Sequence, residues 1–215
     1  MEKTLRVLVW DENPDHVPKS VYPLGIRGEI AGCLAQLGAE HADLPRIVAT
    51  AVHLDQPEQG LEKLDQAEVL IWWGHRRQAE VTDASAEAIR HRVHEQGMGL
   101  IVLHSAHYSK VFRRVLDCSG DLKGGWREDE QPEILRVCAP EHPIAAGVAD
   151  FTLETEEMYA APFAVPPAEC LIFQSYFPAG GEFFPSGLAW STGQGIAPDF
   201  HSGPGGGVGQ GRGKG

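Results

Sequence analysis

The stretch Gly99–His107, GLIVLHSAH, is a short apolar run that ends abruptly in hydrogen-bonding residues. Two other stretches have the same form: Leu5–Trp10 runs into Asp11-Glu12-Asn13, and Val69–Trp73 runs into Gly74-His75. Short apolar runs rich in branched and aromatic side chains are typical of buried strands. Parallel strands place their carboxyl ends at one edge of the sheet, where open α/β sheets bind ligands. The three polar ends therefore predict a reaction centre at that edge.

Helical patterns alternate with these strands through the first 120 residues. Apolar spacing predicts a helix over 20–37, with Gly38 as its C-cap, and Thr82–Gln96 has a capping residue at its start and Gly97 at its end. Further elements are expected as a strand over 47–54, a short helix over 61–65 and a helix over 107–116. This alternation predicts an α/β fold, a doubly wound, mostly parallel sheet in three layers.

The C-terminal part changes character. Strand patterns over 133–138, 151–156, 170–177 and 187–191 are separated by Pro- and Gly-rich turns, and they predict β-rich additions that extend the sheet or form a flap over its edge. Residues 1–192 are expected to form a single domain. From Gly193 onward the chain holds 10 of its 25 glycines, so residues 193–215 are expected to be a disordered or aberrant tail.

Composition excludes several classes of protein. A formal net charge of −12 argues against a nucleic-acid partner. No apolar run reaches the roughly 20 residues that a membrane helix needs, and the N-terminus enters a strand at once, so no secretory signal is expected. The four cysteines are far apart, so they are interpreted as reduced, mostly buried thiols of a cytoplasmic protein. Whether the chain forms a homo-oligomer stays open.

The turn after the third apolar run carries the densest cluster of candidate site residues. His104 and His107 are one helical turn apart and can share a face. Ser105 has two readings: it caps the following helix, or it is a nucleophile at a sharp strand-to-helix turn. His75 follows a permissive glycine and is read as either a site residue or a structural histidine. The histidines at 16, 41, 53, 91 and 94 are treated as surface residues.

Other candidates lie on neighbouring strands. Alternation along the strand places one of Trp72 and Trp73 in the core and leaves the other to stack on a sugar ring or a helix. Alternation also puts Glu156 and Glu157 on opposite faces, so one of them can point into the cleft. His75, His104, His107 and one glutamate would suit zinc or a similar divalent ion, although no compact ligand motif is present.

At these residues the chain resembles the trehalose-utilisation (ThuA-like) family over roughly residues 4–192. The matching stretches are YPLGI at 22–26, LDQPEQGL at 54–61, VLIWWGH at 69–75, GMGLIVLHSAH at 97–107, HPI at 142–144 and EEMY at 156–159. The resemblance implies a flavodoxin-like fold related to class I glutamine amidotransferases. It also implies a place in the catabolism of trehalose and related disaccharides, through 3-keto sugar intermediates.

The chain departs from the family pattern at several positions. The amidotransferase cysteine is replaced by His104-Ser105-Ala106, and Cys118 lies too far away to substitute for it, which argues against thioester chemistry. Arg27 and Gln78 stand where the family often has histidines. The family's C-terminal strand and its PGHE-like segment have no counterpart here, which leaves open an impaired site or one that needs a partner.

Three hypotheses follow. In the first, the protein is an enzyme that acts on a sugar or keto-sugar, with His104 or His107 transferring a proton, Glu157 as partner, and Tyr22, His75 and Tyr159 positioning hydroxyl groups. A divalent metal could polarise a carbonyl. In the second, it is a non-catalytic sugar-binding or assembly protein. In the third, it is a serine hydrolase that uses Ser105 with His107.

Overall fold

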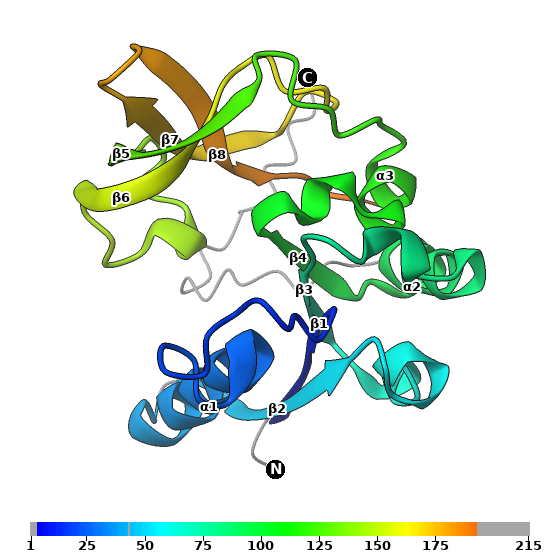
Figure 1. Cartoon of the computed structure of the whole chain (residues 1–215). Helices are drawn as coiled ribbons and strands as arrows, with labels where there is room; N and C mark the ends of the chain where they lie inside the picture. The colour runs from blue at the N-terminus through cyan, green and yellow to red at the C-terminus, as the bar shows by residue number, and fades with distance from the viewer. Residues whose placement is uncertain (1–3, 43, 193–215) are drawn as a thin grey trace, which may run out of the picture.

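The computed structural model describes residues 4–42 and 44–192, which include a four-stranded parallel sheet (Figure 1). Its strands are β1 (Thr4–Asp11), β2 (Arg46–His53), β3 (Val69–Trp73) and β4 (Gly99–Leu103), in the order β2-β1-β3-β4. The register pairs Asp11 with Trp73 and Trp73 with Leu103, so the carboxyl ends of these strands are level. The predicted parallel sheet and its common polar edge are confirmed.

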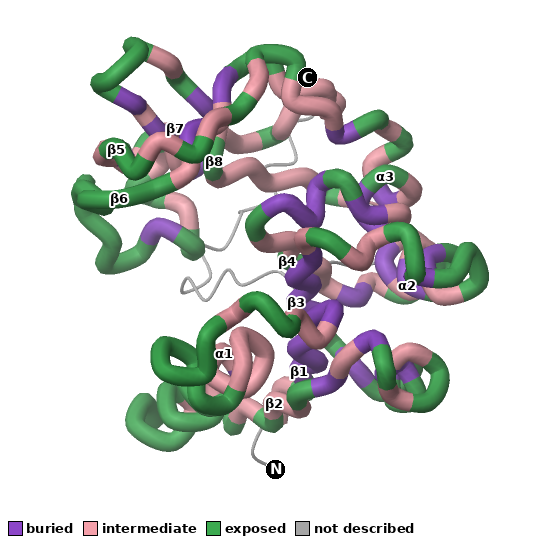
Figure 2. The backbone as a smooth tube through the Cα atoms, viewed as in Figure 1, coloured by how far each residue is buried: buried purple, intermediate pink, exposed green. Residues whose placement is uncertain are grey.

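Helices cover both faces of this sheet. α1 (Gly25–Glu40) lies on one face, and α2 (Asp83–Gln96) and α3 (Lys110–Leu116) lie on the other (Figure 1). Figure 2 shows that buried positions concentrate in the central strands and on the α2 and α3 side, whereas α1 is mostly half-buried or exposed. The structure is therefore the predicted three-layer α/β fold, compatible with a flavodoxin-like arrangement.

Two stacked indoles fill the centre of the α2 face. Trp10 and Trp72 are register partners on adjacent strands, and their ring centroids lie 3.6 Å apart with nearly parallel planes. Both residues are 1% exposed, and Trp10 Nε1 donates to the carbonyl of Gln59 at 2.8 Å. Burying two side chains of this size fixes the pairing of β1 with β3.

The ends of α2 are those that its sequence predicts. Thr82 Oγ1 accepts a hydrogen bond from the Ser85 backbone N–H, and Gly97 ends the helix with φ of 69°. α1 differs, because it begins at Gly25 rather than at residue 20 and continues past Gly38, the expected C-cap. Residues 18–24 form turns instead, and two prolines in that segment supply no backbone N–H.

The short helices are tighter than expected. The predicted helix over 61–65 is a 3₁₀ turn, η2 (Leu64–Gln66), which follows η1 (Pro57–Gly60). The predicted helix over 107–116 is divided into a 3₁₀ turn, η4 (His104–Tyr108), and α3. Ser109 separates them and caps α3 through its hydroxyl, which accepts from the Phe112 N–H. Two further 3₁₀ turns are η3 (Gln78–Glu80) and η5 (Pro143–Ala145).

The C-terminal strands form a second, antiparallel sheet rather than an extension of the first. They are β5 (Trp126–Val137), β6 (Phe151–Tyr159), β7 (Cys170–Phe177) and β8 (Glu182–Ala189), in the order β6-β5-β7-β8. The sheet lies beside the β4 and α3 end of the parallel sheet (Figure 1). Its own core is built on Met158, Ala160, Phe177 and Phe184. This is the flap alternative of the two considered from sequence.

Several expectations from composition are tested only in part. No helix in the described residues is long and apolar enough to cross a membrane. The cysteines are free, as predicted, but none is buried: Cys33 and Cys138 are exposed, and Cys118 and Cys170 are half-buried. The predicted tail, residues 193–215, lies outside the described residues, and the single domain over 1–192 stays a prediction.

Candidate functional site

The two carboxylates at the end of β1, Asp11 and Glu12, are buried and accept hydrogen bonds from backbone N–H groups. They are therefore not open to a ligand. Asp11 is fully buried, and its Oδ1 accepts a hydrogen bond from Arg27 Nη1 at 2.6 Å. Asp11 also accepts the backbone N–H groups of Asn13 and Arg27. Arg27, one of the departures from the family pattern, thus neutralises a buried charge.

Glu12 fixes the loop that follows β3. Its carboxylate is 1% exposed and accepts three successive backbone N–H groups, those of His75 at 2.9 Å, Arg76 at 2.6 Å and Arg77 at 2.8 Å. Arg77 Nη1 in turn donates to the Glu12 carbonyl. Charge-assisted bonds of this kind are stronger than neutral ones, so the position of His75 is set by β1.

His75, Ser105 and His104 form a connected cluster. His75 Nδ1 lies 2.8 Å from Ser105 Oγ and 3.2 Å from His104 Nε2. The Ser105 hydroxyl donates to the Gly74 carbonyl, and Gln78 Nε2 donates to the Ser105 carbonyl. Ser105 therefore does not cap a helix, because Ser109 does so, and its imidazole partner is His75 rather than His107. The serine-hydrolase pairing of Ser105 with His107 is wrong.

His104 occupies a strained backbone position at the start of η4. Its φ is 57°, in the left-handed region that non-glycine residues seldom adopt. The imidazole stacks on Trp73, with ring centroids 5.6 Å apart and planes within 6°. Partial burial lowers the pKa of His104, and the charge of Glu157 opposes that shift. The ring is neutral at neutral pH and can accept a proton.

His107 is buried with one ring nitrogen unsatisfied. His107 Nδ1 donates to the Gly120 carbonyl at 2.7 Å, which leaves Nε2 as a lone-pair acceptor. Within the described residues Nε2 has no hydrogen-bond partner, and the residue is 5% exposed. The rings of Tyr159 and Phe163 approach it edge-on, and burial lowers the pKa of His107. An orphaned buried acceptor of this kind is suited to a ligand's hydroxyl group.

Glu157 and Tyr159 project from β6 toward the histidines. The Tyr159 hydroxyl donates to Glu157 Oε2 at 3.0 Å. Burial, followed by the charge of Glu157, raises the pKa of Tyr159, so its phenol keeps its proton. Glu156 lies at the same wall, contrary to the alternation expected from sequence, because the pairing of β5 with β6 is irregular at Glu156.

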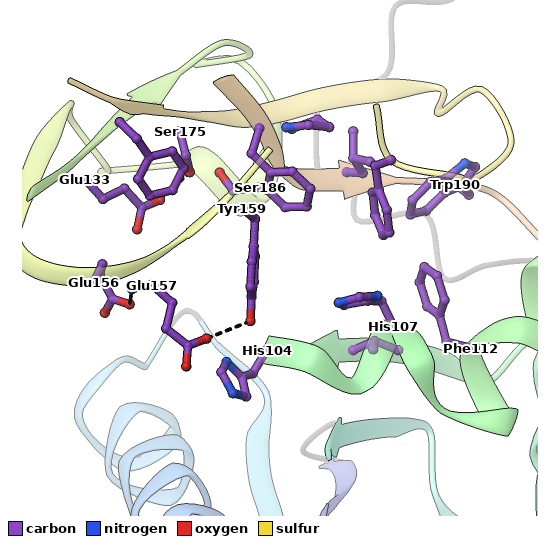
Figure 3. A pocket seen from close by; sticks show the side chains of 16 residues that line it. His104, His107, Phe112, Glu133, Glu156, Glu157, Tyr159, Ser175, Ser186 and Trp190 are labelled. Atoms are coloured by element: carbon purple, nitrogen blue, oxygen red, sulfur yellow. Dashed lines mark hydrogen bonds between the residues drawn. The ribbon is translucent and has the colours of Figure 1, made fainter. Parts of the chain in front are cut away.

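One cavity of about 240 Å³ lies between β4–η4–α3 and the antiparallel sheet (Figure 3). Its lining includes His104, His107, Glu156, Glu157 and Tyr159. This is close to the lower end of the range for small-molecule sites, roughly 300–1,000 Å³. About two thirds of the lining residues were not predicted from the sequence. The missed lining residues are Val102, Phe112, Glu133, Phe163, Ser175, Phe177, Phe184, Pro185, Ser186, Leu188 and Trp190.

The structure brings some of the sequence-predicted residues to this cavity and leaves others behind it. His104, His107, Glu157 and Tyr159 line it. Trp73, His75 and Ser105 are not part of the described lining and contact His104 or its neighbours instead. Tyr22, in the segment before α1, is 41% exposed and is likewise not part of that lining.

One histidine assigned to the surface belongs beside this cluster. The His16 ring centroid lies 5.3 Å from that of His75, and its side chain is 27% exposed. No strand end or helical spacing marks His16 in the sequence, since it lies in the loop after β1.

The zinc site considered from sequence is not assembled. In residues 4–42 and 44–192, no group of three or more His, Cys, Asp or Glu side chains is placed to hold one metal ion. His75 and His104 are directly hydrogen-bonded, and His107 Nδ1 is occupied by a carbonyl.

The family model ThuA, described as trehalose utilisation, matches residues 6–207. The match covers nearly the whole chain and continues past residue 192, where the sequence analysis ended the domain. The comparison with curated proteins gave no match.

Proposed function

Since this chain belongs to the ThuA trehalose-utilisation family, we propose that it transfers a proton on a sugar or keto-sugar bound in the cavity. One observation carries the proposal: two side chains of η4, His104 and His107, converge on a single cavity with Glu157 and Tyr159 of β6. Imidazoles with lowered pKa values are unprotonated at neutral pH and available as bases. The sugar ligand and a cytoplasmic location are parts of this proposal.

The proposed step removes a proton from a carbon next to a carbonyl. His104 Nε2 exchanges its contact with His75 Nδ1 for the substrate, and its lone pair takes the proton. The C–H electron pair then forms a carbon–carbon double bond, and the carbonyl oxygen becomes an enolate. Tyr159, whose phenol stays protonated, exchanges its hydrogen bond to Glu157 for one to that oxygen. Glu157 stabilises the imidazolium that forms, and His107 Nε2 accepts a hydroxyl of the substrate.

Deuterium exchange tests this step without knowledge of the final product. A 3-keto glucoside or 3-keto trehalose would be incubated with the protein in D₂O, and deuterium at the carbons beside the carbonyl would be followed by NMR. General acid–base groups contribute about 10²–10⁴-fold, so His104→Gln should lower the exchange rate at least 100-fold. His91→Gln is the matched control, because His91 is exposed on α2. Exchange that is equal in wild type and His104→Gln would refute the step.

A non-catalytic sugar-binding protein is the second candidate, and the aromatic wall of the cavity favours it. Tyr159, Phe163 and Trp190 offer ring faces or edges to a ligand. The two candidates differ in what His104→Gln does to affinity and turnover. A catalytic His104 predicts sugar affinity within several-fold of wild type and loss of exchange. Binding by a wild-type protein that shows no exchange would support the second candidate.

A further inference from the structure

Glu133 is the one buried carboxyl group of the described residues without a compensating charge or a set of backbone donors. The buried carboxyl groups there are Asp11, Glu12 and Glu133. Asp11 is paired with Arg27, and Glu12 accepts three backbone N–H groups. Glu133 is 9% exposed and has a single described partner, the hydroxyl of Ser175, which donates to Oε1. Burial with one neutral partner is costly for the charged form of a carboxyl group, and groups of this kind concentrate at functional sites.

An irregular strand pairing aims Glu133 into the cavity. The register of β5 with β6 shifts on both sides of Gln131, and Glu130 has φ of 54°. Such bulges re-aim side chains beside functional sites. As a result Glu133, Glu156 and Glu157 line the same cavity, although regular alternation would separate them.

Glu133 and His107 lie on opposite sides of Tyr159 within the cavity (Figure 3). A ligand that contacts the Glu157–Tyr159 pair therefore has Glu133 toward one end and the open Nε2 of His107 toward the other. Burial raises the pKa of Glu133, and Glu156 adds to the shift, so this carboxyl group holds its proton more readily than an exposed one. A carboxyl group in either state pairs well with a hydroxyl, which both donates and accepts.

The lining also lacks a positive charge that could pair with an anion. Among the described lining residues there are three glutamates and no lysine or arginine. A phosphate or carboxylate group in this cavity would meet like charges in a partly desolvated space, which is strongly unfavourable. The chain's net charge of −12 acts in the same direction.

We propose that the cavity selects a neutral, unphosphorylated sugar, and that Glu133 determines this specificity by hydrogen-bonding a sugar hydroxyl. The inference rests on the proposed function in taking the ligand to be a sugar, but it does not depend on proton transfer. It names the substrate class, and it adds Glu133 to the residues that recognise the substrate.

Calorimetric titration with defined probes tests the inference. Trehalose and glucose would be titrated against trehalose 6-phosphate and glucose 6-phosphate, first with the wild-type protein, so that the central comparison needs no variant. Wild type should bind each neutral sugar at least tenfold more tightly than its phosphate. Equal or tighter binding of the phosphates, or no binding of either neutral sugar at millimolar concentration, would overturn the inference.

Variants then test the residue. Glu133→Leu should weaken binding of the neutral sugars by about 10–100-fold, whereas Glu133→Gln, which keeps a donor and an acceptor, should stay within about fivefold. Glu154→Gln is the matched control, since Glu154 is exposed on β6 and not part of the described lining. Unchanged affinity in a folded Glu133→Leu would overturn the role of Glu133.

Deuterium exchange on the same variants separates the two proposals. If wild type exchanges the keto-sugar but Glu133→Leu changes neither KM nor affinity, the proposed function stands and this inference fails. If the wild type prefers neutral sugars and Glu133→Leu does not, but the wild type shows no deuterium exchange, this inference stands and the proton-transfer chemistry fails.

Discussion

Replacing Glu12 by glutamine should destabilise the protein by an amount that its hydrogen bonds set. Glu12 Oε2 accepts the N–H groups of His75 and Arg77, and Oε1 accepts that of Arg76. In Glu12→Gln the amide oxygen can keep the first two bonds, and its NH₂ group then faces the Arg76 N–H, donor against donor. One charge-assisted bond is lost and one buried donor is left unpaired, which costs about 2–3 kcal/mol.

Equilibrium unfolding in urea, followed by tryptophan fluorescence, measures this loss. With a slope of about 2 kcal/mol per M, the midpoint should fall by about 1–1.5 M. Glu68→Gln is the matched control, because Glu68 is exposed and accepts one backbone N–H, that of Arg6 at 2.9 Å. Its loss should stay within about 0.5 kcal/mol.

Glu12→Gln should also have a local effect, since Glu12 positions the loop that carries His75. The imidazole NMR signals of His75 and His104 should shift in Glu12→Gln and stay unchanged in Glu68→Gln. A destabilisation below about 1 kcal/mol, or one equal to that of Glu68→Gln, would refute the assignment of Glu12 as the anchor of this loop.

Three further predictions concern the turn after β4. Burial lowers the pKa of His104 and His107, so between their pKa values in the folded protein and the ordinary value near 6.5 the unfolded chain binds more protons than the folded one. The stability of the wild type should therefore fall as the pH drops from about 7.5 to 5.5. Over the same pH range the urea midpoint of the double variant His104→Gln/His107→Gln should fall less than that of the wild type. Because His104 has φ of 57°, His104→Gly should be about 1 kcal/mol more stable than His104→Ala in the same assay; an equal or lower stability would contradict the strain. Ser109→Ala should lower the free energy of unfolding by about 1 kcal/mol because the α3 cap is lost. Ser105→Ala should instead displace the NMR signals of His75. If Ser105→Ala lost about 1 kcal/mol of stability without displacing those signals, the assignment of Ser105 would be wrong.

The elements that the sequence predicts well are those with local signals. The apolar run Val69–Trp73 and the capped helix Asp83–Gln96 carry their own periodicity and end residues, and the structure confirms both. His104 and His107 could be predicted as site candidates because a parallel sheet fixes where strand ends lie. Their convergence with Tyr159 and Glu157 follows once the second sheet is placed.

The rest of the site depends on contacts between distant segments. Glu133 enters the cavity through a register shift between β5 and β6, which no two-residue alternation can indicate. The Nδ1 of His107 is held by the carbonyl of Gly120, and the role of Glu12 depends on a loop more than 60 residues away. Neither partner carries a signal in its own sequence. The side chains proposed for the site can therefore be predicted from sequence better than the residues that position them.

The walls of the cavity come from two stretches of chain that do not overlap. The lining residues of the first stretch lie within Val102–Phe112 and those of the second within Glu133–Trp190. Both imidazoles belong to the first stretch, and all three glutamates belong to the second. Recombination that replaces the C-terminal sheet would therefore leave both imidazoles in place but would change the three glutamates and Tyr159 together. Ligand recognition and the groups that assist proton transfer would then change in one step.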